Sequence, residues 1–344
     1  MNQTRQHMQT MGRLLRGGTG VLRAKGRGGS FPFSMTFILT NRCNFRCSYC
    51  NIPATKSEEM STAEIKDALS TFAKRGLVRA SFSGGEALLR PDTVEIIGHA
   101  KSLGLMTSLN TNAWFTQPLM TQLAGVLDLL VLSLDGPRAE HDTARRQVGS
   151  YERVIASLDA ARSHGLATAT ITVLSSANVH VIDDVIALAQ THGAYAYVQP
   201  AYESCFDFRD GFDPSFSDRI FGDIAARLRL AHKRNEPVGA SPGYVERLAK
   251  GPFFSDCSQC SAGRFWGTVL PDGTLLPCHL LQDQPGATPW PNGRELGFSE
   301  AFDRLHRVKA GPGCAISPYQ ETDLIFSLDR RAMASAVRRL LGQR

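Results

Sequence analysis

The sequence predicts an α/β fold in which six parallel strands alternate with helices to form a (β/α)6 partial barrel. Short apolar runs of strand length alternate with stretches of helical periodicity from Phe33 to Tyr202. The apolar runs end in Gly, Asn, Asp, Ser or Pro, and a loop with three cysteines follows the first run. Parallel βα units with right-handed crossovers bring such strand ends to one edge of the sheet, where α/β folds place their sites.

The predicted elements of the barrel follow one another in a regular order. Strands are expected at residues 37–39, 78–82, 105–109, 129–134, 167–174 and 194–198. Helices are expected at residues 63–74, 91–103, 117–124, 150–164 and 179–192. Ser61 and Glu64 have the spacing of a capping box, Pro91 suits the first turn of a helix, and Gly165 marks a helix end.

The chain is long enough for one large domain and a smaller one. We expect a basic leader at residues 1–32, the barrel at 33–202, and a helical linker at 203–256 with helices at 217–233 and 244–250. A small cysteine-bearing domain follows at 257–325, with a β-hairpin around Pro271-Asp272-Gly273 and loop-rich sequence through Gly313. Residues 326–344 are expected to carry a C-terminal helix.

Composition is that of an ordinary soluble globular protein, with 42% hydrophobic and 20% charged residues. The eight cysteines fall in two clusters with outliers. This usage indicates metal ligation in a reducing compartment rather than disulfides, so we expect a cytoplasmic protein. No apolar run approaches the length needed to span a bilayer.

The first part of the chain is basic and contains no acidic residue before Glu58. The basic residues ahead of the first strand are Arg5, Arg13, Arg16, Arg23, Lys25 and Arg27. Such a segment is typical of a solvated and partly disordered arm. Contact with a phosphate-rich partner or an anionic membrane surface is the alternative, although we expect no nucleic-acid partner. The lack of acids also resembles a transit peptide, but the apolar stretch of a signal peptide is missing.

The stretch MTFILTNRCNFRCSYC ends the first strand and places three cysteines, Cys43, Cys47 and Cys50, on one loop. Three residues separate the first pair and two separate the second, so the loop can turn three sulfurs toward one point, as an iron–sulfur cube requires. A cube has four corners, so one iron would lack a protein ligand, and an open metal position is typical of a working site. The alternative is a zinc loop, which would need a fourth ligand that is not nearby.

The segment CNFRCSYC resembles the C-x3-C-x-aromatic-C loop of the radical SAM superfamily, and its place after the first strand is similar to theirs. The resemblance implies a radical SAM core that covers the predicted barrel. It also implies that the open iron of a [4Fe–4S] cluster chelates the amino and carboxylate groups of S-adenosylmethionine. Reductive cleavage would then yield a 5′-deoxyadenosyl radical for C–H abstraction, with electrons from a reductant such as flavodoxin or ferredoxin.

The same resemblance assigns residues to S-adenosylmethionine. Gly84, Gly85 and Glu86 match the loop that binds the methionine amino group, and glycines there would let a ligand approach the backbone. Ser133 and Arg145 match positions that bind the methionine carboxylate, with Asp135 on the face of Ser133. The remaining matches are Asn110 and Asn112 for the ribose, and Tyr49, Val173, Leu174 and Gln199 around the adenine. Ordinary turn residues, a surface arginine and barrel core are the alternative roles.

A second group of cysteines lies beyond the barrel. Cys257, Cys260 and Cys278 flank the predicted hairpin, and this region resembles the twitch or SPASM module that carries an auxiliary iron–sulfur cluster. Cys314 is the expected fourth ligand, with Cys205 and His279 as the next choices. A zinc ribbon is the alternative. With four thiolates the cluster would relay electrons or stabilise the fold, whereas with three it could bind substrate.

The substrate is less defined by the sequence. Cys205 follows the sixth strand, so we consider it as a hydrogen-atom donor, with a buried unreactive thiol as the alternative. His141 and the polar run from Tyr319 to Asp323 are candidate substrate contacts. A peptide, a cofactor precursor, another small molecule or a lipid is the expected substrate class. The alternatives are a molybdenum-cofactor-type GTP cyclase, whose glycine-rich tail this sequence lacks, and a non-catalytic metal-binding adaptor.

Overall fold

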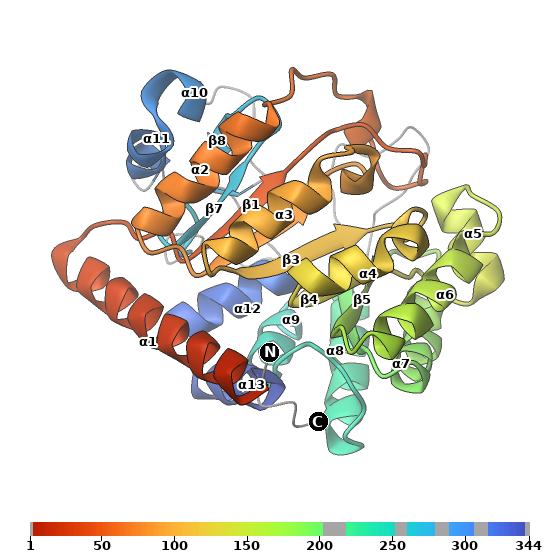
Figure 1. Ribbon diagram of the computed structural model, residues 1–344. Helices are drawn as coiled ribbons and strands as arrows, with labels where there is room; N and C mark the ends of the chain where they lie inside the picture. The colour runs from red at the N-terminus through yellow and green to blue at the C-terminus, as the bar shows by residue number, and fades with distance from the viewer. Residues whose placement is uncertain (1–2, 202–217, 252–259, 279–288, 306–315, 341–344) are drawn as a thin grey trace.

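The computed structural model describes residues 3–201, 218–251, 260–278, 289–305 and 316–340. Six parallel strands pair side by side in the order β6-β5-β4-β3-β2-β1. Their bounds are β1 Ser34–Ile38, β2 Arg79–Ser83, β3 Met106–Thr111, β4 Leu129–Ser133, β5 Thr168–Leu174 and β6 Tyr195–Pro200. The parallel (β/α)6 partial barrel predicted from the apolar runs is therefore confirmed (Figure 1).

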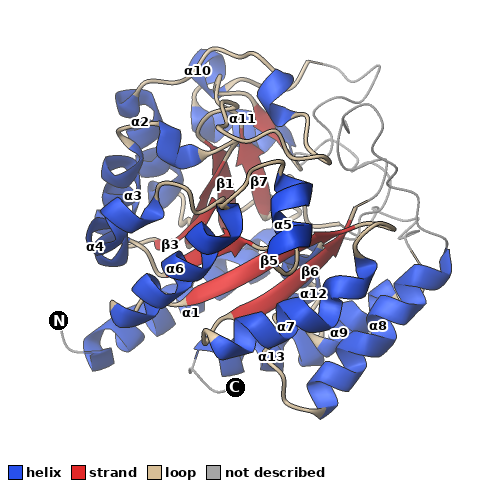
Figure 2. Ribbon diagram, turned by 90° about the vertical axis from the view of Figure 1, so that its right-hand side faces the viewer, coloured by secondary structure: helices blue, strands red, loops and turns tan. Residues whose placement is uncertain are grey.

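Helices cover the outer face of this sheet, with α6 and α7 beside β5 and β6 (Figure 2). The covering helices are α2 Thr62–Lys74, α3 Thr93–Ser102, α4 Thr116–Val126, α6 Ser150–Ser163 and α7 Ile182–Thr191. Phe37 of β1 stacks on Phe82 of β2 with ring centroids 5.8 Å apart, and Phe72 of α2 contacts Phe37 edge-on. Because strand side chains alternate, the other face is more polar, and there the Ser108 hydroxyl donates to Ser81 Oγ over 3.1 Å.

The predicted hairpin is present, and it extends the barrel sheet. Strand β7 (Trp266–Val269) pairs in parallel with β1, with Ser34 opposite Trp266, and β8 (Leu275–Leu276) pairs with β7 antiparallel. The hairpin region and the barrel therefore share one eight-stranded sheet. The other predicted domain boundaries stay predictions.

Some helices were not predicted, because they lack apolar periodicity or lie among prolines and glycines. Helix α5 (Arg138–Arg145) is almost wholly polar, and its buried residues are His141 and Arg145, four positions apart on one face. The prediction of loops up to Gly313 was wrong at α11 (Phe298–Leu305), whose phenylalanines pack on Phe72. Helices α10 (Gly293–Leu296) and α12 (Ser317–Phe326) were not predicted either. The helices predicted at 217–233, 244–250 and near the C-terminus are present as α8 Asp218–Lys233, α9 Pro242–Leu248 and α13 Arg330–Leu340. Short 3-10 turns occur at η1 Ile52–Ala54, η2 Ala87–Leu89 and η3 Val179–Val181.

The basic leader is a helix, α1 (Gln3–Arg27), so the expectation of a solvated, disordered arm was wrong (Figure 1). Its second half packs through the buried residues Val21 and Ala24, which share a cluster with Phe265, Trp266 and Phe326. Gly17 and Gly20 allow this close approach, since a Cβ on Gly20 would lie 2.4 Å from the ring of Phe31. The prediction of disorder rested on amino-acid composition, and composition does not show that small residues lie on one face of a helix. Among the described helices, none is long and apolar enough to cross a membrane.

Candidate functional site

The three cysteines of the first loop lie between β1 and α2, beyond the carboxyl end of β1. Cys47 is buried, whereas Cys43 and Cys50 are half-buried. They share a small apolar cluster, whose members are Phe45, Cys47 and Tyr49 with Cys43, Cys50, Trp114, Ala144 and Val173 packed against them. The loop therefore brings its thiols to the edge of the sheet at which the strands end.

The sulfur atoms receive polar hydrogens from the protein. The backbone N–H of Phe45 donates to Cys43 Sγ over 3.4 Å, and Asn112 Nδ2 lies 3.9 Å from the same sulfur. Arg145 Nη1 lies 3.9 Å from Cys47 Sγ. Burial raises the pKa of Cys43 to about 11 and also raises the pKa of Cys47, which Arg145 opposes. Three thiols on one loop, two of them with N–H groups facing their sulfurs, are a donor set that fits an iron–sulfur cluster.

Thiolates that ligate a cube bind different irons. In the part of the chain that the structure describes, no three His, Cys, Asp or Glu side chains are close enough to hold a single metal ion. This spacing is compatible with a cube, whose ligands do not have to meet at one metal ion.

The loop after β2 is joined to the start of the cysteine loop by backbone hydrogen bonds. Gly85 N donates to Thr40 O over 2.8 Å, and Glu86 N donates to Arg42 O over 2.9 Å. A Cβ on Gly84 would lie 2.4 Å from Thr40 O, and one on Gly85 would lie 2.4 Å from Arg42 O. The two glycines are therefore required by the approach of the cysteine loop itself, which differs from the ligand approach that the sequence suggested.

Glu86 is 1% exposed and accepts hydrogen bonds on both carboxylate oxygens. Its donors are the Thr111 hydroxyl at 2.9 Å, the backbone N–H of Asn112 at 2.8 Å and that of Leu88 at 3.0 Å. Burial raises the pKa of Glu86, although these donors oppose the shift. The carboxylate thus ties the ends of β2 and β3 together.

The two predicted ribose contacts differ in their surroundings. Asn112 Nδ2 donates to Asn44 Oδ1 over 2.8 Å, and its Oδ1 accepts from Trp114 N over 3.0 Å. This is the turn chemistry considered as the alternative for Asn112. Asn110 is half-buried near the end of β3, opposite Val131 of β4.

Asp135 is the polar centre on the other side of the cysteine loop. It is 0% exposed, and its Oδ2 accepts from Tyr49 Oη over 2.8 Å and from Arg145 Nε over 2.7 Å. Its Oδ1 accepts from Val173 N over 3.0 Å. The Arg145 guanidinium also lies over the Tyr49 ring, 5.5 Å from the centroid. One carboxylate thereby holds the arginine that faces Cys47 and the tyrosine next to Cys50.

The backbone N–H of Asp135 donates to His141 Nδ1 over 3.1 Å. His141 is 1% exposed, and burial together with the charge of Arg145 lowers its pKa to about 4. The neutral imidazole of His141 therefore accepts from the backbone of Asp135 and holds that residue in place. Its burial favours this supporting role over the candidate role as a substrate contact.

The other predicted positions divide between the mouth of the barrel and its core. Ser133 is half-buried at the end of β4, and Val173 packs on the cysteine cluster. Gln199 of β6 lies beside Val173 in register. Leu174 is 0% exposed in the core between sheet and helices, which was the alternative role considered for it.

The second group of cysteines is only partly described. Cys260 and Cys278 lie in one small apolar cluster with Phe265, Trp266 and Phe326, among others. Cys205, Cys257 and Cys314 lie outside the described residues, as does His279. The predicted pairing of Cys260 with Cys278 at one site is therefore compatible with their positions.

Helix α12 holds this second region against the barrel. Asp323 Oδ1 accepts from both the backbone N–H and the hydroxyl of Ser261, each at 2.9 Å, directly after Cys260. Arg247 of α9 donates to Asp323 Oδ2 over 3.0 Å. Tyr319 stacks on Trp266 with centroids 4.4 Å apart. The polar run from Tyr319 to Asp323 is thus part of a helix that bridges α9 and β7.

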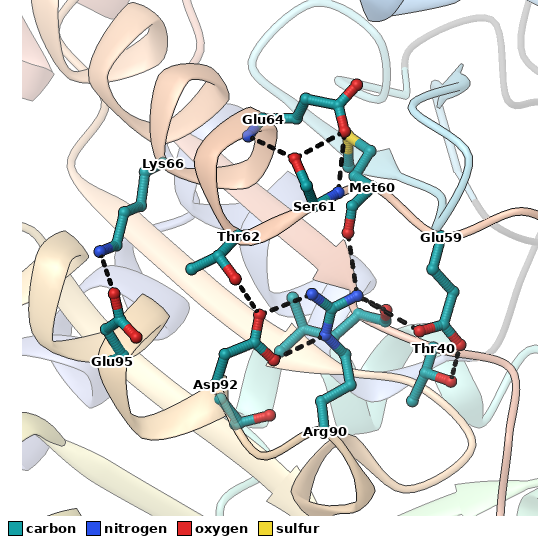
Figure 3. A network of polar contacts seen from close by, with 12 residues as sticks. Thr40, Glu59, Met60, Ser61, Thr62, Glu64, Lys66, Arg90, Asp92 and Glu95 are labelled. Atoms are coloured by element: carbon teal, nitrogen blue, oxygen red, sulfur yellow. Dashed lines mark hydrogen bonds and ion pairs between the residues drawn. The ribbon is translucent and has the colours of Figure 1, made fainter.

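Sequence reasoning missed one polar group, formed by Glu59, Arg90 and Asp92 at the base of the loop that carries the three cysteines (Figure 3). Arg90 follows Glu86 by four positions, so it is near a recognised motif. No spacing rule distinguishes such an arginine from a surface residue. Only its burial, 7% exposed, reveals it.

The chain is similar to known proteins over most of its length. Residues 37–189 match the Radical SAM superfamily. The chain is 30% identical over 319 residues to a PqqA peptide cyclase of Xanthomonas campestris pv. campestris (strain B100), covering 85% of this chain and 81% of the relative. A PqqA peptide cyclase of Gluconobacter oxydans (strain 621H) is 29% identical over 289 residues, covering 79% of this chain and 76% of the relative.

Solved structures with the same fold are similar at low identity. Streptococcus suis SuiB bound to S-adenosylmethionine has a TM-score of 0.65 and 15% identity, covering 82% of this chain and 68% of that one. Native anSMEcpe with bound AdoMet has a TM-score of 0.61 and 15% identity, covering 89% and 99%. These structures show the fold, and the family match together with the sequence relatives excludes the non-catalytic adaptor. The chain belongs to the radical SAM superfamily, whose enzymes use a [4Fe–4S] cluster and S-adenosylmethionine for radical chemistry.

Proposed function

We propose that Cys43, Cys47 and Cys50 hold the [4Fe–4S] cluster of a radical SAM enzyme that modifies a peptide. The observation that carries this proposal is the convergence of the loops after β1 to β4 on the three thiols. The backbone N–H of Phe45 and the side chain of Asn112 face the sulfur of Cys43, and Arg145 faces that of Cys47. When bound, the cluster and S-adenosylmethionine supply a 5′-deoxyadenosyl radical that removes a hydrogen atom from the substrate.

The residues around the thiols would bind and orient S-adenosylmethionine. Arg145 uses its Nε for Asp135, so its Nη groups are those that would meet the methionine carboxylate, next to Ser133. Backbone groups of Gly84 and Gly85 would meet the amino group. Asn110 would contact the ribose. The adenine would lie near Tyr49, Val173 and Gln199.

The relatives support a peptide as the substrate class, because the sequence relatives are named PqqA peptide cyclases. A cofactor precursor, a lipid and GTP are the weaker candidates.

We further propose that Cys260 and Cys278, with Cys257 and Cys314, ligate an auxiliary [4Fe–4S] cluster. A flavodoxin- or ferredoxin-type protein would supply electrons to the clusters. Cys205 is the candidate hydrogen-atom donor.

Anaerobic reconstitution tests the radical generator. Reduced wild-type protein should release 5′-deoxyadenosine from S-adenosylmethionine, and Cys47→Ala should lose one cluster and that activity. Cys278→Ala should retain one cluster per chain and lose substrate turnover. Bound zinc, or cleavage that persists in Cys47→Ala, would contradict the assignment. Iron content unchanged in Cys278→Ala would remove the auxiliary cluster from the proposal.

The peptide assignment is tested separately. Reduced enzyme is incubated with a pool of short synthetic peptides, with GTP, or with neither, and 5′-deoxyadenosine formation is compared. Peptides that carry deuterium should transfer it into 5′-deoxyadenosine, and a cyclised peptide should lose the mass of two hydrogen atoms. If GTP stimulates 5′-deoxyadenosine formation and peptides do not, the result would favour the molybdenum-cofactor-type GTP cyclase.

A further inference from the structure

We propose that Arg90 and Glu59 form a clasp at the base of the cysteine loop, defined as residues 40–59, and that this clasp keeps the loop in the shape that receives the cluster. This inference rests on the proposed function of Cys43, Cys47 and Cys50. Arg90 and Glu59 do not face the sulfurs, so they act as positioning residues.

One nitrogen of Arg90 holds both ends of the cysteine loop. Arg90 Nη1 donates to Leu39 O, at the entry of the loop, over 3.4 Å and to Met60 O, at its exit, over 3.0 Å. The guanidinium is 7% exposed, and the same nitrogen donates to Glu59 Oε2 over 3.3 Å (Figure 3). The twenty residues between these carbonyls carry all three cysteines of the first group.

Glu59 connects this closure to the first residues of the loop. Its Oε1 accepts from Thr40 Oγ1 over 2.5 Å and from Arg42 Nε over 3.0 Å. Burial opposes ionisation of Glu59, but hydrogen bonds from Arg42 and Thr40 lower its pKa. Thr40 Oγ1 also accepts from Arg42 N over 3.0 Å. The residue directly before Cys43 is therefore fixed by side chain and backbone.

Asp92 orients the guanidinium. Arg90 Nε donates to Asp92 Oδ1 over 3.0 Å and Nη2 donates to Oδ2 over 2.7 Å, a bidentate pair. The Thr62 hydroxyl donates to Asp92 Oδ2 over 2.6 Å. With its planar fork fixed in this way, Arg90 can direct Nη1 only toward the loop ends.

Helix α2 does not need the clasp to begin. Ser61 and Glu64 form a complete capping box at its start. The contacts of Arg90 with Leu39 and Met60 therefore act on closure of the loop. Fixing the ends of a flexible loop removes conformational entropy that cluster binding would otherwise have to overcome.

The test compares Arg90→Gln with a matched control, Arg75→Gln. Arg75 also makes a bidentate pair, with Asp303, at 2.7 and 3.0 Å. It caps the other end of α2 and joins it to α11, away from the cysteine loop. Both variants lose an arginine that bridges elements, so both should lose some stability in denaturant. Only Arg90→Gln removes the closure of the loop.

Two measurements on full-length protein read the loop itself. In reconstituted protein, we expect an iron chelator to strip the first cluster about tenfold faster from Arg90→Gln than from wild type, with Arg75→Gln near wild type. In cluster-free protein, a maleimide should label buried Cys47 about tenfold faster in Arg90→Gln. Arg90→Lys, which keeps the charge and loses the fork, should recover part of both effects.

Equal rates in Arg90→Gln and Arg75→Gln, in either measurement, would overturn the clasp. If Arg90→Gln does not fold, Glu59→Gln replaces it, and wild-type rates in that variant would overturn the proposal as well. The labelling measurement needs no cluster. A wild-type protein that binds no iron would therefore refute the proposed function, while unchanged labelling would refute the clasp.

Discussion

The two sides of the barrel mouth hold the cysteine loop by different means. On the side of β1 to β3, backbone hydrogen bonds from Gly85 and Glu86 join the loop to its neighbour, and Arg90 closes its base. On the side of β4 and β5, one backbone hydrogen bond, from Ser48 N to Ala144 O over 2.8 Å, joins the loop to α5, and the other contacts meet at the buried carboxylate of Asp135. The side-chain and backbone contacts of the first side are spread over several residues, whereas most side-chain contacts of the second side meet at Asp135.

The difference has a consequence for mutational sensitivity. A backbone hydrogen bond is retained when a side chain is replaced, so the Cys43 end of the loop keeps part of its support in most variants. The Cys47 end keeps the backbone hydrogen bond of Ser48, but the side chain that faces the Cys47 sulfur is Arg145, whose position depends on Asp135. We therefore expect substitutions near Cys47 to have the larger effects.

The largest effect is expected for Asp135→Ala. It leaves the buried guanidinium of Arg145 without its carboxylate, and breaking a buried pair in this way costs about 3–5 kcal/mol of unfolding free energy. Denaturant unfolding of the cluster-free protein measures the loss. Asp303→Ala is the control, because its carboxylate is 39% exposed and pairs with Arg75 at the far end of α2, so it should cost at most about 1 kcal/mol. Equal losses would mean that the concentration of contacts at Asp135 has no energetic consequence.

The next-largest effect concerns the stability of the protein at acidic pH, which depends on His141 on the side of β4 and β5. His141 has a pKa of about 4 in the fold against an ordinary 6.5, because it is buried and near Arg145. The unfolded chain takes up a proton below 6.5 and the folded protein does not until about 4. The contribution of neutral His141 to the free energy of unfolding should therefore be fully present above pH 6.5, and it should fall by about 3 kcal/mol as the pH drops toward 4.

His141→Asn should flatten this part of the pH profile, because its Oδ1 can accept from Asp135 N without titrating. The neighbouring charges of Asp135, Asp142 and Arg145 are present in both proteins, so the difference between the two profiles isolates His141. Unfolding curves at several pH values provide the measurement. Parallel profiles would show that His141 does not contribute.

A smaller effect on the first side is expected for Gly85→Ala. The new Cβ would lie 2.4 Å from Arg42 O, a backbone atom, so the two loops must separate at a cost of about 1–3 kcal/mol. Gly98→Ala in α3 is the control, since its Cβ would make ordinary contact with Val126 at 3.5 Å and should stabilise the helix by about 0.5–1 kcal/mol. Thermal unfolding of both variants compares them. A Gly85→Ala variant with wild-type stability would show that the contact with Arg42 does not require glycine there.

Local patterns were sufficient for the parallel strands and for the location of the site. Alternating apolar runs predict where chain segments become strands, and polar strand ends predict the edge at which residues such as Asn110 and Ser133 lie. The polar helix α5 was not predicted, because its buried face consists of His141 and Arg145 rather than apolar side chains. The ordered α1 was missed because Gly17 and Gly20 pack on Phe33, Val78 and Phe31, which lie outside the helix and which no helical periodicity relates to it.

The sequence alone determined the radical SAM assignment, because three cysteines within eight residues need no tertiary contact to be recognised. Tertiary structure decided which side chains surround the loop that carries those cysteines. Asp135 and Tyr49 are 86 positions apart, and Arg90 meets Leu39 across 51 positions. Such pairings arise from the packing of parallel strands, since neighbouring strands bring together residues that no local spacing relates.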